Sequence, residues 1–321
     1  MRLPHPLLNS QFFQYASLSE LLKATERALS ESERELMLQL SGKGLPPISS
    51  RAALAAMLGI NEGLIWSFEA RPGRHYRTFY IPKGKDVRRI DAPRVALKIV
   101  QKWIGFQLAK AYLPPEHVCG FVEGRSHIDA ARIHCRATWV FGVDIQNFFP
   151  TTPIDVVARA LLDIGYHELG AVLISRLCCF ENALAQGAPS SPILSNMCFA
   201  SYDQRLKAIA DRYGARLTRY ADDIVFSGQD DFPVALKEEV LGIFASGPWA
   251  LSNQKIKLAV WPQRLKVHGL LVHGDQLRLT KGYRNRLRAY EHLLAAGKIR
   301  AESISVVRGH LGYKDQVAKR A

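Results

Sequence analysis

Two short β-prone runs separated by only three residues constrain the fold of this chain most strongly. Leu217–Tyr220 and Ile224–Ser227 flank Ala221-Asp222-Asp223, which predicts a tight hairpin with two adjacent carboxylates at its turn. Asp is common in turns, so the plain interpretation is a surface turn. The alternative is that these carboxylates hold a metal ion.

A third aspartate favours the metal interpretation. Asp144 follows an apolar strand, Trp139–Val143, far earlier in the chain. If that strand pairs with the hairpin, Asp144 and Asp222 can share a pair of Mg²⁺ ions, which prefer hard oxygen ligands. Carboxylates this close repel each other unless a cation lies between them. The arrangement therefore predicts a divalent-metal site, although an Asp that follows a strand is also a common helix cap.

The charge is unevenly distributed and indicates a polyanionic partner. The chain carries 43 Lys and Arg against 29 Asp and Glu, a net charge of +14. Residues 71–102 hold 10 basic and 2 acidic side chains, and residues 255–321 hold 15 and 4. Residues 103–254 hold 12 and 16, so an acidic centre lies between two basic flanks. This pattern suits a metal site served by elements that bind phosphates.

The order of predicted elements indicates an α+β fold. Helical periodicity covers residues 16–41, two helices follow between Ser49 and Ala70, and a strand pair with a basic loop follows between 76 and 93. Further helices are predicted at 94–113, 153–180, 192–213 and 233–245, a second hairpin at 263–280, and basic helices thereafter. The helix pair before Ala70 also resembles a DNA-reading helix-turn-helix. Its second helix has no Lys or Arg, so a packing role is favoured.

Nothing in the sequence indicates a membrane or secreted protein. Mean hydropathy is -0.06, no stretch approaches 18 uncharged apolar residues, and the first residues lack a secretory signal. The five cysteines have no CxxC spacing, which favours buried reduced thiols in the cytoplasm over disulfides or zinc.

Four motifs in order resemble the successive motifs of reverse transcriptases: "VDIQNFFP", "QGAPSSP", "RYADD" and "LSNQKIK". "LCCFENALAQGAPSSPILSN", "VDIQNFFPTT" and "VVRGHLGY" are similar to retron reverse transcriptases in particular, and the likeness spans roughly residues 70–321. The resemblance implies a right-hand polymerase with fingers, palm (an antiparallel sheet plus helices) and a helical thumb. The implied domains are N-terminal helices 1–70, fingers 71–138, palm 139–272 with an interleaved finger segment at 153–188, and a basic thumb 273–321.

The resemblance also implies roles for single residues. Asp144, Asp222 and Asp223 would be catalytic and would hold two Mg²⁺ ions with the Ile145 carbonyl, and Phe149 would exclude a ribose 2′-OH. Without the motif, Phe149 is an ordinary core aromatic, and each basic residue is an ordinary surface charge. The further implied nucleotide contacts are Lys83, Lys85, Arg88, Gln186 and Gly187, with Lys255, or its neighbour Lys257, as a proton donor to pyrophosphate.

Two histidines stand where this sequence departs from the retron pattern. "AARIH" retains His134 but has Ala130 in place of Asn, and "VHG" has His268 in place of Thr. The resemblance associates both elements with RNA recognition, while satisfied structural histidines are the alternative. Near the end of the chain, Lys281, Arg284 and Arg288 are spaced three and four residues apart, which predicts one basic helical face for RNA or an RNA–DNA hybrid.

The resemblance thus implies an RNA-directed DNA polymerase that adds dNTPs in the presence of Mg²⁺. It would copy part of its own structured non-coding RNA, prime from a ribose 2′-OH, and leave DNA joined to RNA. Such systems commonly serve antiphage defence, and we expect any effector protein to be a separate chain. The alternatives are a group II intron-like or defence-associated reverse transcriptase, and a non-catalytic RNA-binding protein.

Overall fold

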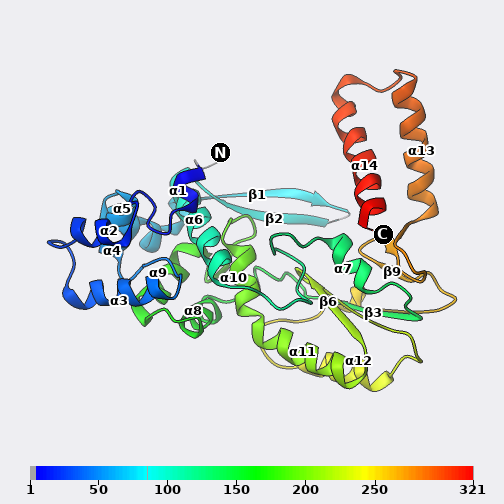
Figure 1. Ribbon diagram of the computed structural model, residues 1–321, viewed down its shortest axis with the longest axis horizontal. Helices are drawn as coiled ribbons and strands as arrows, with labels where there is room; N and C mark the ends of the chain where they lie inside the picture. The colour runs from blue at the N-terminus through cyan, green and yellow to red at the C-terminus, as the bar shows by residue number, and fades with distance from the viewer. Residues whose placement is uncertain (1–4, 85, 321) are drawn as a thin grey trace. The chain divides into compact units, whose positions relative to one another are not determined.

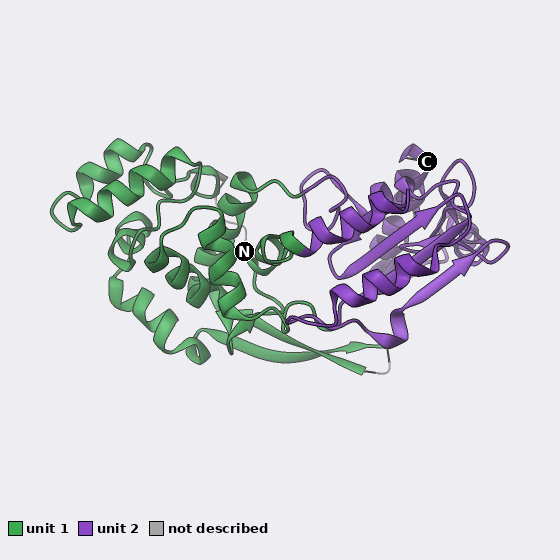
Figure 2. Cartoon of the chain, turned by 90° about the horizontal axis from the view of Figure 1, so that it is seen from below, with its two compact units in different colours: residues 1–114, 147–201 green, residues 115–146, 202–321 purple. Residues whose placement is uncertain are grey.

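The computed structural model describes residues 5–84 and 86–320, which fold into two compact units (Figures 1 and 2). Unit 1 comprises residues 1–114 and 147–201, and unit 2 comprises residues 115–146 and 202–321. Helices and antiparallel strands occur in both units, which confirms the predicted α+β class. The finer division into fingers, palm and thumb stays a prediction.

Unit 1 begins with short helices, and the segment 16–41 with its predicted helical periodicity is divided between two of them. Residues 16–41 do not form one helix, because Ser30 starts a new one. Its side chain accepts a hydrogen bond from the Glu33 N–H while the Glu33 carboxylate accepts one from the Ser30 N–H, a capping box. The first helices are α1 (His5–Asn9), α2 (Leu18–Ala24), α3 (Glu31–Gly42), α4 (Arg51–Leu58) and α5 (Glu62–Ala70).

A β-hairpin and a long helix follow in unit 1. The hairpin strands pair along their whole length, with Arg88 opposite Ile81. The helix buries an apolar face that includes Trp103. The remaining elements of unit 1 are η1 (Pro72–Arg74), β1 (Tyr76–Lys83), β2 (Asp86–Pro93), α6 (Val95–Ala111), α8 (Ile154–Asp163), α9 (Glu168–Cys178), β4 (Cys179–Phe180), β5 (Ala183–Leu184) and α10 (Ser191–Cys198).

Unit 2 is built on a four-stranded antiparallel sheet with strand order β6-β7-β3-β8. The central strands are apolar and almost wholly buried, as the run from Trp139 to Val143 predicts. The sheet strands are β3 (Trp139–Asp144), β6 (Arg216–Tyr220), β7 (Asp223–Gly228) and β8 (Lys257–Val260). The accompanying helices are α7 (His127–Ile133), α11 (Ala200–Arg212, which begins at the end of unit 1), α12 (Val234–Ile243) and η2 (Asn253–Lys255).

The end of unit 2 is a three-stranded sheet that carries a pair of helices. The predicted hairpin at 263–280 has a third strand, with order β11-β10-β9. An apolar cluster joins this sheet to α7 and to the helical pair through residues such as Leu265, Leu287 and Val317. The elements are β9 (Lys266–Val267), β10 (Leu270–Leu271), β11 (Arg278–Leu279), α13 (Lys281–Ala295) and α14 (Ala301–Arg320).

Two expectations about the chain as a whole can be compared with the structure. All five cysteines are free and buried, as predicted. Across residues 5–84 and 86–320, no helix has the length and apolar character needed to cross a membrane.

Candidate active site

The three predicted catalytic aspartates lie together at one end of the unit 2 sheet. β3 ends at Asp144, which is directly opposite Asp223 at the start of β7. Asp222 occupies the turn before β7, and its carbonyl oxygen accepts a hydrogen bond from the Ile145 N–H at 2.9 Å. The predicted pairing of the two aspartate-bearing strands is therefore confirmed.

The Asp144 side chain is largely buried beside two other carboxylates. Burial raises the pKa of Asp144, and the charges of Asp222 and Asp223 raise it further. A hydrogen bond from the Lys255 ammonium to Asp144 Oδ2, 2.6 Å long, acts in the opposite direction. Lys255, predicted to donate a proton to pyrophosphate, is thus placed as a counter-charge to Asp144.

The donor set fits a hard divalent cation. Carboxylate oxygens and the Ile145 backbone carbonyl are ligands that Mg²⁺ prefers. The Lys255 ammonium already binds Asp144, so this carboxylate stabilises a positive charge beside it. In the described conformation, no three His, Cys, Asp or Glu side chains of residues 5–84 and 86–320 are grouped closely enough to hold a metal. The ligand assignment therefore stays a prediction.

His268, predicted as an RNA contact, lies beside the aspartates, and the RNA contact stays a prediction. Its side chain is only 8% exposed, and Nδ1 lies 3.2 Å from Asp223 Oδ2. The ring also packs against Tyr220, with ring centroids 5.4 Å apart. The residue that replaces Thr in the retron pattern is therefore a neighbour of the third aspartate.

His134 is buried in the sheet, which favours the structural alternative over the predicted RNA contact. The side chain is completely buried, and hydrogen bonds of 2.7 Å join Nδ1 to Ser227 Oγ and Nε2 to Thr218 Oγ1. Both ring nitrogens are therefore used within the sheet. Burial, with a smaller contribution from the charge of Arg216, lowers the pKa of His134 to about 3.

The buried His134 predicts a pH dependence of stability. Because its pKa lies below the value in the unfolded chain, only the unfolded state takes up the proton as the pH falls below about 6.5. The free energy of unfolding should then decrease by about 1.4 kcal/mol per pH unit toward pH 3. Urea unfolding of the wild-type and His134→Gln proteins at pH 7 and pH 5 tests this. Equal pH dependence in the two proteins would contradict it.

Several predicted nucleotide contacts lie in unit 1. The Gln186 carbonyl accepts a hydrogen bond from the Asp91 N–H at 2.9 Å, which attaches this loop to β2, the strand that carries Arg88. Gly187 has φ +135, and a Cβ there would lie 3.0 Å from the Asp91 carbonyl oxygen, so glycine is required. Lys83 is exposed at the end of β1, and Lys85 lies outside the described residues.

Phe149 is half-buried in unit 1, and its ring stacks on Phe148 with centroids 6.0 Å apart. If it excludes a ribose 2′-OH, Phe149→Val should raise ribonucleotide incorporation relative to deoxynucleotide by about 10- to 100-fold. Comparing kcat/KM for CTP and dCTP opposite a template G measures this ratio. Unchanged discrimination in a protein that still uses dCTP well would identify Phe149 as a packing residue only.

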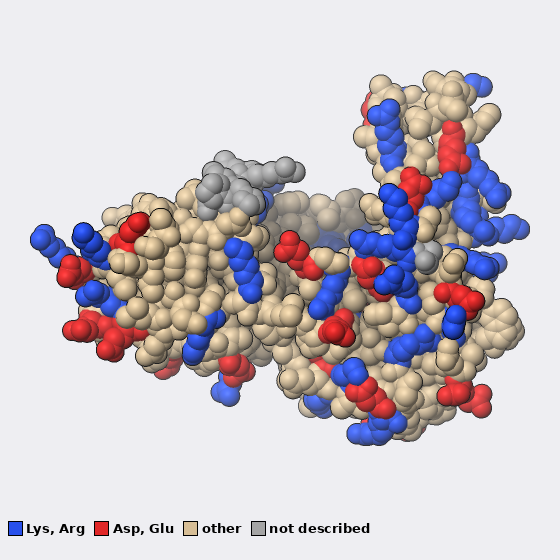
Figure 3. Space-filling model, in the orientation of Figure 1, with Lys and Arg blue, Asp and Glu red and all other residues tan. Residues whose placement is uncertain are grey.

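The predicted basic face of α13 is present. Lys281, Arg284 and Arg288 are all exposed on this helix. Figure 3 shows Lys and Arg side chains gathered over the helical pair and its base. Their position is compatible with the predicted phosphate contacts, which remain a prediction.

A second basic surface lies within the basic segment 71–102, and its residues were not among the predicted site residues. A hollow of about 560 Å³ in unit 1 is lined by apolar residues of β2 and α6 and by four cations, namely Arg77, Arg94, Lys98 and Lys102. Among the described residues, no carboxylate forms an ion pair with any of the four. The spacing of four between Arg94, Lys98 and Lys102 was the signal that could have revealed it.

Comparison with known proteins shows the same likeness as the motifs. Residues 81–272 match the family described as reverse transcriptase (RNA-dependent DNA polymerase). The chain is 31% identical to the retron Mx65 reverse transcriptase of Myxococcus xanthus, over 94% of this chain and 76% of that protein. It is 28% identical to the retron Ec86 reverse transcriptase of Escherichia coli, over 74% and 75%. A telomerase structure from Candida albicans aligns with a TM-score of 0.46 at 10% identity, covering 68% of this chain and 50% of that one.

Proposed function

Because the chain belongs to the retron-type reverse transcriptases and is an RNA-directed DNA polymerase, we propose that it copies part of its own structured non-coding RNA. Synthesis would start from a ribose 2′-OH and leave the DNA covalently joined to RNA. The observation that supports polymerisation most directly is the register of β3 and β7, which sets Asp144 opposite Asp223 with Asp222 in the adjoining turn.

We assign the metal ligands to the aspartate cluster. Asp144, Asp222 and Asp223 would hold two Mg²⁺ ions together with the Ile145 carbonyl. Bound metal would activate the attacking hydroxyl and stabilise the departing pyrophosphate. Because Lys255 now neutralises Asp144, its ammonium would have to leave that carboxylate when metal binds, which would free it to face the pyrophosphate.

We assign binding of the incoming dNTP to unit 1 residues. Lys83 and Arg88 on the β1–β2 hairpin would contact the triphosphate. Gln186 and Gly187 are attached to the same hairpin through Asp91, so they would contact the nucleotide beside it. Phe149 would reject the ribose 2′-OH.

Two cationic surfaces support an RNA partner. Lys281, Arg284 and Arg288 on α13 are exposed, and the unit 1 hollow holds four cations without an ion-pair partner among the described carboxylates. Clustered cations repel one another and are neutralised well by phosphates. We propose that both surfaces bind the RNA or its RNA–DNA product.

The setting of the enzyme is also proposed. We place it in the cytoplasm, in antiphage defence, beside a separate effector protein. The relatives that match over most of the chain carry the name retron, which supports this setting over a group II intron-like or other defence-associated reverse transcriptase. Family membership favours a polymerase over a non-catalytic RNA-binding protein.

Sequencing the nucleic acid that copurifies with the active protein tests the priming mechanism. We expect a DNA whose 5′ end is joined to an internal ribose of an RNA, so that RNase digestion leaves a short branched remnant on the DNA. If active preparations yield only unbranched DNA, the enzyme primes differently and a non-retron reverse transcriptase becomes the better assignment. The Asp222→Asn protein, which should bind the RNA without extending it, is the matched control.

A further inference from the structure

The turn that carries Asp222 has a backbone conformation that needs outside support. Ala221, which precedes Asp222, has φ +60, in the left-handed region that residues with a Cβ rarely adopt. Such conformations persist where the surrounding structure holds them. The groups that hold Ala221 therefore bear on the position of the Asp222 carboxylate.

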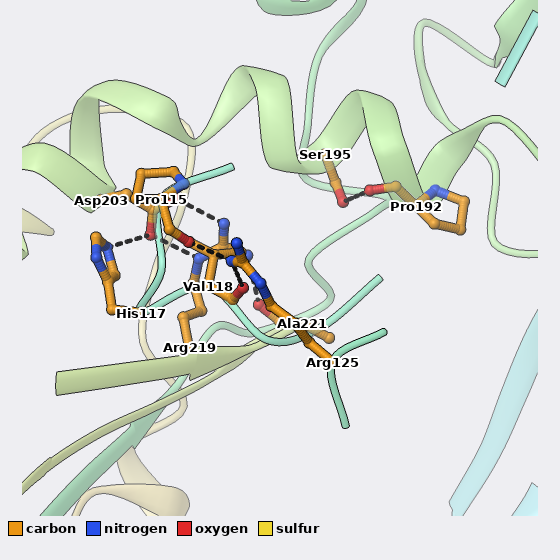
Figure 4. Close-up of polar contacts among 9 residues, drawn as sticks. All are labelled: Pro115, His117, Val118, Arg125, Pro192, Ser195, Asp203, Arg219 and Ala221. Carbon is orange, nitrogen blue, oxygen red and sulfur yellow. Dashed lines mark hydrogen bonds and ion pairs between the residues drawn. The ribbon is translucent and has the colours of Figure 1, made fainter. Parts of the chain in front are cut away.

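The first support is the guanidinium of Arg219, two residues before the turn. Its Nε and Nη2 donate to the two carboxylate oxygens of Asp203 on α11 at 2.7 and 2.6 Å, and its Nη1 donates to the Ala221 carbonyl oxygen at 3.1 Å (Figure 4). Both charged side chains are only 1% exposed. Because the guanidinium is a rigid planar fork, fixing two of its nitrogens on Asp203 also fixes the third against the turn.

The second support is the backbone of residues 117–120. The Arg219 N–H donates to the His117 carbonyl at 2.8 Å, and the Arg219 carbonyl accepts from the Cys119 N–H at 2.7 Å. The chain then passes so close to the turn that a Cβ on Gly120 would lie 2.1 Å from the Ala221 nitrogen. The turn is therefore held both by the Arg219 side chain and by the backbone at Gly120.

A buried ion pair is a weak explanation of stability alone. Removing two charges from water is costly, and apolar side chains of similar volume often give an equally stable protein. An apolar pair cannot, however, donate a hydrogen bond to the Ala221 carbonyl. This difference separates a positioning role from a purely structural one.

We propose that Arg219, oriented by Asp203, is a positioning residue that fixes the Ala221 carbonyl and so aims the Asp222 carboxylate at the divalent metal. The inference rests on the proposed assignment of Asp222 as a metal ligand. It concerns how that ligand is held, which the motif itself does not specify.

The test replaces the ion pair by apolar residues in the full-length chain, as Arg219→Met with Asp203→Leu. We expect a melting temperature within about 5 °C of the wild type, because buried volume is kept. Mn²⁺ affinity, measured by electron paramagnetic resonance without substrates, should fall by about 10- to 100-fold. The half-saturating Mg²⁺ concentration for primer extension should rise in parallel. Arg51→Met with Glu69→Leu, which removes a 2.7 Å ion pair in unit 1, is the matched control and should leave both metal measurements unchanged.

Two results would overturn the proposal: unchanged Mn²⁺ affinity in the doubly substituted protein, or an equal fall in the control. If the double variant does not melt cooperatively, Arg219→Lys replaces it. Lysine keeps a cation beside Asp203 but cannot bridge to the turn, so Mn²⁺ affinity should still fall, and wild-type affinity would refute the proposal. The Asp222→Asn protein distinguishes the assignment of Asp222 as a metal ligand from the assignment of Arg219 as its positioning residue. Wild-type Mn²⁺ affinity in that protein would show that Asp222 is not a ligand.

Discussion

The Asp222→Asn protein is expected to lose DNA synthesis on a primed RNA template by about 1,000-fold or more. The amide keeps the shape of the side chain but removes the negative charge that would hold the metal, which corresponds to about 4 kcal/mol of transition-state stabilisation. Asp144→Asn should have an effect of similar size, since the two strands place these residues at the same end of the sheet. Single-turnover primer extension at saturating dNTP and Mg²⁺ measures the loss.

Stability distinguishes this loss from unfolding. The pKa of Asp144 is raised partly by the charges of Asp222 and Asp223, so the carboxylates repel one another when no metal is bound. Removing one charge should leave the metal-free melting temperature equal to or above that of the wild type. Asp231→Asn, at an exposed position of the same unit, is the control and should retain wild-type activity. An Asp222→Asn protein that extends primers at the wild-type rate would reject the metal assignment.

The parts of the site that follow from strand and turn patterns could be predicted. The Asp222-Asp223 turn follows from two short β-prone runs, and an apolar strand ending at Asp144 had an evident partner in that hairpin. Gly187 was predicted as a nucleotide contact, which stays a prediction, and the structure adds that its φ of +135 beside the Asp91 carbonyl requires glycine. Local patterns of hydrophobicity and turn residues specify such features directly.

Side-chain contacts between distant elements could not be predicted. The Asp203–Arg219 pair and the His268–Asp223 contact each join elements that one sequence gives no reason to bring together. The same is true of His134, whose two hydrogen-bond partners lie on β6 and β7. A histidine or arginine in a motif indicates importance, but burial and partners decide whether it binds a ligand or supports the fold.

A helix boundary could not be predicted where a local capping signal competed with the leucine periodicity. Leucine spacing extends across residues 16–41, yet the Ser30–Glu33 capping box begins a new helix within it. The predicted domain boundary at 138/139, which stays a prediction, lies within unit 2 and not at a boundary between the compact units. Residues 115–138 belong to unit 2, in part because Val118 pairs in parallel with Arg219 of β6.

The basic face of α13 carries the second large predicted effect. Lys281, Arg284 and Arg288 are exposed, and the buried residue of this helix is Leu287, which anchors it to the unit 2 core. Because the cations are displayed on a packed helix, their removal should change charge without changing the fold. Arg286 is also exposed on α13 but lies on the opposite side of the helix from Arg284, at a separation of two residues.

Replacing Lys281, Arg284 and Arg288 together by Gln should weaken binding of a structured RNA by about 10- to 100-fold near physiological salt. With fewer phosphate contacts, RNA binding releases fewer counterions. The negative slope of log affinity against log salt should therefore become shallower by about 2 to 3 for the triple variant. Fluorescence anisotropy over a salt series measures both quantities. The single variants Arg284→Gln and Arg286→Gln compare the two faces of the helix, and only the first should reduce the slope. Equal effects of the two would show that α13 acts through net charge alone, while an unchanged slope in the triple variant would place the RNA elsewhere on the protein.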